Sequence, residues 1–278
     1  MRSIIFAVTL LCLSITSFSQ STPPDTKSNK GRLYIYWGWN RAWFTHSNIT
    51  FKGDNYNFTL KDVVAKDRQS PFDADLYLNP TKMSIPQTDF RLGYFLTNHW
   101  NISFGVDHMK YVMKQNQEVD IAGYIAKTET PYDHIYNNDK IVLTSDFLMF
   151  EHTNGLNYVN IEMRRNDQLF SFKKKGFPKT DVNVMAGTGA GILYPRTNTK
   201  LLDYERYDEF HVAGYGLGAV TGVNVTFWNI FFLQTEVKGG FINMPDIKTT
   251  KSSTGKGSQH FFFLQHNYEL GLSIKLGK

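Results

Sequence analysis

The stretch that most constrains the fold lies near the carboxyl end, at residues 259–276, where the sequence alternates over an unusual length. One set of alternate positions is almost wholly apolar: Phe262, Leu264, His266, Tyr268, Leu270, Leu272, Ile274 and Leu276. The other set mixes aromatic with amide, carboxylate and ammonium groups: Phe261, Phe263, Gln265, Asn267, Glu269, Gly271, Ser273 and Lys275. Successive side chains of a strand point to opposite faces, so this stretch predicts one long two-sided strand. Globular strands usually have about five or six residues. The length and the apolar face together indicate the last strand of a membrane-spanning barrel.

Residues 1–19 have the composition of an export signal. Arg2 gives a positive start, residues 4–15 are mostly apolar, and Ser17-Phe18-Ser19 supplies a small-x-small cleavage site. The apolar run is too short to span a bilayer as a helix. We therefore expect a cleaved secretory signal peptide at 1–19, a flexible lead-in at 20–30 and one barrel domain at 31–278. Cys12 is the only cysteine of the chain, so the mature protein is expected to have no disulfide and no thiol chemistry.

Seven further stretches alternate in the same way, at 33–40, 89–96, 102–107, 157–164, 182–192, 210–227 and 231–241. Their connections differ in length: 46–87 and 114–156 are long and polar, whereas Thr97-Asn98-His99 and Trp228-Asn229 are tight turns. Short turns at one end and long loops at the other are typical of outer-membrane barrels, whose long loops lie outside the cell. The pattern predicts an all-β, antiparallel, up-and-down transmembrane barrel of eight strands with long extracellular loops. Ten strands are the alternative, if 118–126 and 141–150 form an extra pair.

The composition agrees with a barrel and excludes several classes of partner. Aromatic residues make up 15% of the chain, with 22 Phe and 15 Tyr, as expected for aromatic girdles. The net charge of +5 is mild and the longest basic cluster is Lys173-Lys174-Lys175, so we expect no nucleic-acid partner. The histidines of the expected strands stand singly, and this spacing predicts no metal site and no cofactor.

Polar faces that point inward would enclose charges of both signs: Arg91, Asp107, Glu162, Arg164, Glu236, Lys238, Glu269 and Lys275. An eight-stranded barrel is just wide enough for side chains to fill its interior, and an unpaired buried charge is very costly. We therefore expect a salt-bridged network and a largely closed lumen. A pore would more often carry charges of one sign.

The segment Glu151-His152-Thr153-Asn154-Gly155 is the main candidate for chemistry, at the expected outer rim. A hydrolase needs a hydroxyl within hydrogen-bond reach of a histidine base, oriented by a carboxylate. Thr153, Ser145 and Glu151 are the weak candidates for these roles beside His152. Adjacent side chains on a strand point to opposite faces, so His152 and Thr153 act together only if the segment turns. The main prediction is that the chain has no catalytic site.

The signal, strand lengths, loop asymmetry and closing strand resemble those of small outer-membrane β-barrel proteins of gram-negative bacteria. Segments 150–158, 187–197 and 239–249 are similar to parts of such barrels from the Bacteroidota. The resemblance implies a place in the cell outer membrane, among its lipid and lipopolysaccharide. Small barrel enzymes that act on lipid A carry a His-x-Ser-Asn pattern, to which residues 152–154 are faintly similar.

Three functions follow from these patterns. The first is a non-enzymatic barrel with a structural or surface-binding role, in which residues 50–79 and 117–140 present aromatic and charged groups to a surface protein or polysaccharide. The second is a lipid A-modifying hydrolase of the deacylase kind that uses His152. The third is a narrow porin.

Overall fold

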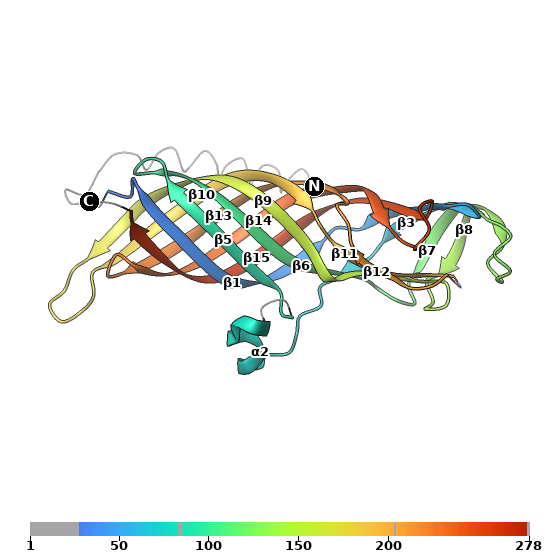
Figure 1. The fold of residues 1–278 in the computed structure, drawn as a ribbon, viewed down its shortest axis with the longest axis horizontal. Helices are drawn as coiled ribbons and strands as arrows, with labels where there is room; N and C mark the ends of the chain where they lie inside the picture. Colours follow the sequence, from blue (N-terminus) through green and yellow to red (C-terminus); the bar gives the residue numbers. More distant parts are fainter. Residues whose placement is uncertain (1–27, 83–84, 203, 277–278) are drawn as a thin grey trace.

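The computed structural model describes residues 28–82, 85–202 and 204–276; the expected signal peptide at 1–19 lies outside them. The strands form one antiparallel sheet that closes on itself (Figure 1). Eight strands make the ring: β1 (Arg32–Phe44), β5 (Thr88–Phe95), β6 (Trp100–Met113), β9 (Leu148–Phe172), β10 (Thr180–Leu193), β13 (Gly214–Phe227), β14 (Phe231–Lys248) and β15 (Lys256–Lys275). Pairing of β1 with β15 completes it. The predicted eight-stranded antiparallel barrel is confirmed.

The other strands extend the barrel beyond the ring, at its long-loop end. β2 (Ser47–Gly53), β3 (Tyr56–Val63), β7 (Glu118–Ile125) and β8 (His134–Val142) continue the sheet from β15 in that order. On the other side, β11 (Arg196–Leu201) pairs with β9 and with β12 (Tyr207–Phe210), while β4 (Ala65–Lys66) pairs with β6. We call this part the extension. β7 and β8 lie here, at the right of Figure 1. β7 matches the first of the two extra strands considered for a ten-stranded ring, at 118–126, but its partner β8 lies at 134–142 and not at 141–150, and neither strand enters the ring.

Helical structure is confined, in the described residues, to α2 (Ala74–Leu78) and the short 3-10 turn η2 (Pro80–Lys82). Neither they nor any other described segment forms a helix long and apolar enough to cross a membrane.

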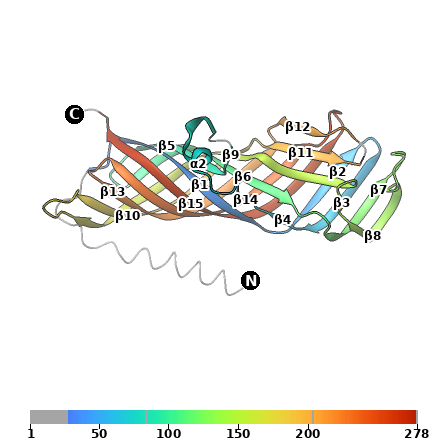
Figure 2. The same ribbon diagram turned by 90° about the horizontal axis from the view of Figure 1, so that it is seen from below.

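The end of the ring opposite the extension has the tight connections. Between β5 and β6 the Thr97 hydroxyl accepts hydrogen bonds from the backbone N–H groups of His99 and Trp100. Between β13 and β14, Trp228 and Asn229 adopt positive φ values of 51° and 61°, the backbone of a tight hairpin turn. Arg32 pairs with Lys275, so β1 begins and β15 ends at this same end (Figure 2).

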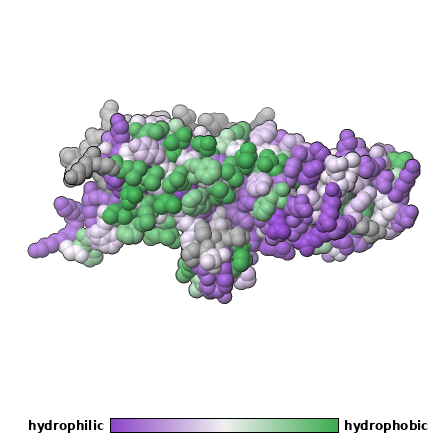
Figure 3. Space-filling view, viewed as in Figure 1, coloured by the Kyte–Doolittle hydropathy of each residue, from purple (hydrophilic) through white to green (hydrophobic). Residues whose placement is uncertain are grey.

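Outward side chains of the ring are apolar and inward side chains are polar. On β15, Leu270 and Leu272 are 45% and 41% exposed, whereas the alternate residues Asn267 and Glu269 are 1% and 4% exposed. Figure 3 shows the resulting band of apolar surface, the apolar belt, on the face of the ring that is in view. A water-soluble barrel has the opposite arrangement, and a lipid-facing wall requires this one. The ring is therefore a transmembrane barrel.

The outer limit of the apolar belt is marked by a change of residue type on four strands. Its last outward residues are Val106, Val159, Phe241 and Phe262, and the next outward residues on the same strands are His108, Asn157, Asn243 and His260. At the opposite end, Trp100 and Trp228 are 43% and 60% exposed, as expected of aromatic residues at a membrane interface.

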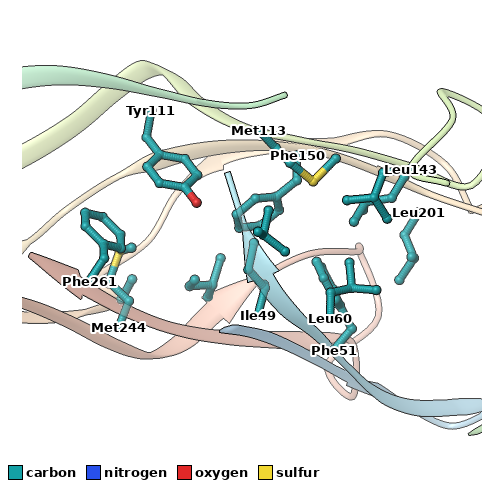
Figure 4. Packing of buried hydrophobic residues seen from close by; sticks show 14 of the residues in the cluster. Ile49, Phe51, Leu60, Tyr111, Met113, Leu143, Phe150, Leu201, Met244 and Phe261 are labelled. Carbon is teal, nitrogen blue, oxygen red and sulfur yellow. The ribbon is translucent and has the colours of Figure 1, made fainter. Parts of the chain in front are cut away.

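Past this limit the interior of the barrel becomes apolar. On β15 the inward series changes from Gln265 to Phe263 and Phe261, and on β6 it changes from Asp107 to Met109 and Tyr111. These side chains join residues of β2, β3, β9, β11 and β14 in one buried cluster, part of which is shown in Figure 4: Ile49, Phe51, Leu60, Phe150, Leu201 and Met244. The extension is thus built like a water-soluble protein, on strands that also cross the membrane.

Candidate functional site

Six of the eight charged residues expected in the lumen meet in one cluster: Arg91, Asp107, Glu162, Arg164, Glu236 and Lys238. Each is at most 3% exposed, and they come from β5, β6, β9 and β14, so the cluster bridges opposite walls. Glu162 lies at its centre. Its carboxylate accepts from Arg91 at 3.0 Å, Arg164 at 2.6 Å and Lys238 at 2.7 Å.

The outer members of the cluster are also paired. Arg164 Nη1 lies 2.5 Å from Glu236 Oε1, and Lys238 Nζ lies 2.6 Å from Asp107 Oδ2. The Tyr36 hydroxyl accepts from Arg164 at 3.1 Å and donates to Glu236 at 3.3 Å. Tyr36 was not among the predicted network residues, although the alternation on β1 placed it inward. Such mutual pairing is what several charges need inside a membrane.

Glycines on the neighbouring strands leave room for these large side chains. A Cβ atom added at Gly105 would lie 2.7 Å from the guanidinium carbon of Arg91, and one at Gly189 would lie 2.4 Å from Cγ of Glu162. Both distances are shorter than van der Waals contact. The inward glycines therefore fit the cluster, as packing of small against large side chains requires.

The remaining predicted charges lie outside the ion pairs. Glu269 is 4% exposed, and neither of its carboxylate oxygens has a hydrogen-bond partner among the described residues. Asp89, which the sequence analysis left out, is 1% exposed and accepts from Asn40 Nδ2 at 2.8 Å. Lys275 is exposed where β15 ends, so its predicted place in the lumen is wrong. The ion-paired cluster itself holds three cations and three carboxylates, and Asp89 and Glu269 add two buried carboxyl groups that make no ion pair with the described residues.

Different environments lie on the two sides of the cluster. Toward the short turns there is a polar pocket of about 60 Å³, lined among others by Arg32, Tyr34, Asp181, Thr226 and Gln234. Toward the extension, the centre of the Tyr158 ring lies 6.0 Å from Nζ of Lys238 and 6.1 Å from the centre of the Phe263 ring. The buried apolar cluster continues from there. The charged cluster thus lies between a polar pocket and an apolar core.

His152 lies inside the extension rather than at an accessible rim. Its side chain is 0% exposed, with its ring 5.6 Å from that of Tyr111 and 5.0 Å from that of Phe150. Nδ1 lies 2.9 Å from the hydroxyl of Thr197 on β11, a residue that the sequence analysis did not single out. Burial lowers the pKa of His152 to about 4, so the imidazole is neutral at pH 7.

The other candidates for chemistry are not beside His152. Thr153 Oγ1 donates to Glu151 at 3.0 Å, on the opposite face of β9, and Ser145 is exposed in the loop before this strand. Glu151 also pairs with Arg68 at 3.1 Å. Among the described residues, no group of three or more histidine, cysteine, aspartate or glutamate side chains is arranged to hold a metal ion. The geometry separates the histidine from the carboxylate that would orient it.

No protein-family model matches this chain, and no curated protein sequence matches it. Among solved structures it is similar to the outer membrane protein OprG from Pseudomonas aeruginosa, with 9% identity, a TM-score of 0.41, and coverage of 90% of this chain and 99% of that one. For Neisserial surface protein A the identity is 14% and the TM-score 0.32, with coverage of 89% and 100%. For the outer membrane protease OmpT from Escherichia coli the identity is 6% and the TM-score 0.24, with coverage of 90% of this chain and 99% of that one.

These values are too low to carry an argument, so the fold assignment depends on the closed strand ring, the apolar belt and the buried charges described above. The chain is a transmembrane β-barrel of the outer-membrane type, with eight strands in its ring and long connections at one end.

Proposed function

We propose that this protein lies in the outer membrane of a gram-negative bacterium and binds a protein partner at the cell surface through its extension. In this proposal the charged cluster holds the ring closed and has no catalytic role. The affiliation with Bacteroidota barrels stays a prediction. The observation that carries the proposal is that β2 and β3, from the first segment expected to bind (50–79), and β7 and β8, from the second (117–140), lie next to one another in one sheet.

The pairing of β3 with β7 joins these segments. It runs from Tyr56 opposite Ile125 to Lys61 opposite Asp120. Inward residues of both strands, such as Phe58 and Ile121, are 0–1% exposed. Ordering so much chain costs conformational entropy, which the buried core of the extension offsets. A membrane anchor does not need this core, whereas a binding surface benefits from a fixed shape.

β8 offers the most suitable binding edge of this sheet. It pairs with β7 and with no other described strand, so its second edge presents unpaired backbone groups. Ile135 on β8 is 79% exposed, and Tyr124, directly opposite on β7, is 43% exposed. An open edge flanked by apolar side chains suits the addition of an extended peptide segment as a further strand. The proposed partner is therefore a protein with such a segment.

An adherence assay tests this function. Cells that display the full chain are applied to surfaces coated with collagen, fibronectin or laminin and, separately, with purified capsular polysaccharide. We expect adherence to a protein surface that falls at least tenfold in Ile135→Lys and is unchanged in Val212→Lys. Val212 is a matched control because it is 49% exposed and lies next to β12, away from β8.

Three results would overturn the proposal. Equal adherence of both variants would exclude the β8 edge, adherence to polysaccharide alone would exclude a protein partner, and failure to adhere to every surface would exclude the binding function. Faster migration of the unheated barrel on a denaturing gel verifies that each variant is folded.

The hydrolase and porin hypotheses have less support. The complete burial of His152 keeps lipid away from the only histidine proposed as a base. We expect His152→Ala to leave the lipid A mass spectrum unchanged; a gained acyl chain would restore the hydrolase hypothesis. Planar-bilayer recordings are expected to show no conductance, since ion-paired side chains fill the ring; steady single-channel currents would favour the porin.

A further inference from the structure

Residues 70–82 form a small projection on the outer wall of the barrel, which we call the hook. It contains α2 and η2 and belongs to the connection between β4 and β5. In Figure 1 α2 stands off the side of the barrel, beside the ring strands β1 and β6. Figure 3 shows that the apolar belt gives way to polar surface near this place.

The base of the hook is held against the barrel wall. Asp67 accepts hydrogen bonds from the backbone N–H of Ala42 at 3.2 Å and from the side chain of Gln87 at 2.6 Å. Lys110 on β6 donates to the carbonyl oxygen of Ile85 at 2.5 Å. Although Lys110 and its neighbour His108 face outward, they are only 7% and 8% exposed. The connection therefore covers the wall just beyond the limit of the belt.

The hook has an ordered interior that continues the apolar belt. The ring of Tyr77 lies 6.0 Å from that of Trp39, an outward residue of β1, and 5.5 Å from that of Phe72. Its hydroxyl donates to the carbonyl oxygen of Ser70 at 2.6 Å. Asp73 caps α2 by accepting from the N–H of Leu76 at 2.9 Å. Aromatic contact thus runs from the lipid-facing wall into the hook.

The tip carries apolar side chains that the other described residues leave exposed. Phe72 is 81% exposed and Leu78 is 59% exposed. Ile85, just beyond the hook, is 48% exposed. In water such exposure is unfavourable, while at a bilayer surface the same side chains are buried among acyl chains. Arg41 and Lys66, near the base, are also exposed, and basic side chains at this level suit anionic headgroups.

We propose that the hook is an interfacial anchor, in which Phe72 and Leu78 enter the outer leaflet of the membrane beside the barrel while Arg41 and Lys66 contact its anionic headgroups. The occupant of the exposed apolar face is membrane lipid, because the face is continuous with the lipid-facing belt through Tyr77 and Trp39. The hook would fix how deeply the barrel sits and resist its rotation about its own axis.

Site-specific fluorescence tests this proposal. Cys12 is the only cysteine and lies in the expected signal peptide, so the barrel is produced from residue 20 onward without it. The variants Phe72→Cys, Leu78→Cys and Ile135→Cys then each carry one cysteine for an environment-sensitive NBD label. Ile135 is the matched control, because its exposed fraction of 79% is close to the 81% of Phe72 and it lies in the extension. The full barrel is reconstituted in phosphatidylethanolamine–phosphatidylglycerol vesicles, with and without nitroxide-labelled acyl chains.

We expect emission at positions 72 and 78 to be shifted to the blue by at least 10 nm relative to position 135, and to be quenched at least twofold by the nitroxide lipids. Emission at position 72 equal to that at position 135 would overturn the proposal. A blue shift without quenching would also overturn it, since the label would then lie against protein, as in contact with a second copy of the chain.

The charged part of the anchor has a separate test. In the labelled Phe72→Cys protein, a further Arg41→Gln, Lys66→Gln change keeps the tip and removes two basic side chains. We expect quenching at position 72 to rise with the phosphatidylglycerol fraction in the parent and to lose at least half of that dependence in the double variant. An unchanged dependence would exclude these two residues as headgroup contacts.

Discussion

Replacing Glu162 by glutamine is expected to destabilise the barrel strongly. The carboxylate of Glu162 is 3% exposed and lies within 3.0 Å of nitrogen atoms of three cations, Arg91, Arg164 and Lys238. Removing one partner from a buried ion pair typically costs about 3–5 kcal/mol, because the opposite charge stays buried without compensation. We expect a loss in this range, since the three cations keep only Asp107 and Glu236 as ion-pair partners.

Glu269→Gln is the matched control. Glu269 is 4% exposed, close to the exposure of Glu162, yet its carboxylate has no hydrogen-bond partner among the described residues. The substitution replaces a buried carboxyl group by an amide of nearly the same size and breaks no ion pair among the described residues. We expect a change in the free energy of unfolding of at most about 1 kcal/mol, or a gain in stability.

Urea titration of the reconstituted barrels measures both effects, with tryptophan fluorescence and unheated gel mobility as probes. With a denaturant slope of roughly 1–3 kcal/mol per molar urea, a loss of about 4 kcal/mol lowers the midpoint by about 2 M for an intermediate slope. Equal midpoints for the two variants, or a larger loss in Glu269→Gln, would refute the reasoning that direct ion pairs determine the stability of the lumen.

Two further predictions concern single positions. Stability is expected to decline as the pH falls from about 6.5 to about 4, because His152 takes up a proton in the unfolded chain while burial lowers its pKa in the folded protein to about 4. The loss amounts to at most about 3 kcal/mol; urea titrations at several pH values should show a smaller decline in His152→Gln, and an identical decline would contradict the prediction. Gly240→Ala is expected to cost about 1–3 kcal/mol from overpacking, since its Cβ would lie 2.2 Å from the carbonyl oxygen of Leu217. Gly239→Ala, whose Cβ has its nearest described neighbours 3.7 Å away on the outer face, should be neutral; equal thermal shifts for the two variants would refute this.

The ring was predictable from the sequence because its signal is local and repeated. Lipid on one side and packed polar groups on the other impose the same alternation on every strand, as on β9 with Ile161 outward and Glu162 inward. Which charged side chains point into the lumen follows from that alternation. Their pairing does not, because contacts across the lumen depend on how each strand is staggered against its neighbours. Nothing in the local sequence therefore distinguishes the paired Glu162 from the unpaired Glu269.

The extension was missed because its strands are stabilised by residues far away in the chain. Ile49 and Phe51 alternate inward on β2, as do Phe58 and Leu60 on β3, so a short signal exists within a segment that is polar overall. Pairing of β2 with β15 is what gives these side chains an interior. For the same reason His152 was expected at an open rim, whereas the barrel wall continues past it and encloses it.

β6 and β15 keep one alternation from the lipid zone to the water zone while the chemical character of both faces changes midway. Inward and outward positions on these strands therefore repeat every two residues along their whole length. Inserting one residue near the middle would turn every side chain beyond it to the opposite face of the strand. Phenylalanine side chains would then be exposed to solvent, and the polar side chains of the outer surface would be buried. An insertion of two residues would only lengthen the strand. Selection on either half of such a strand thus constrains the spacing of both.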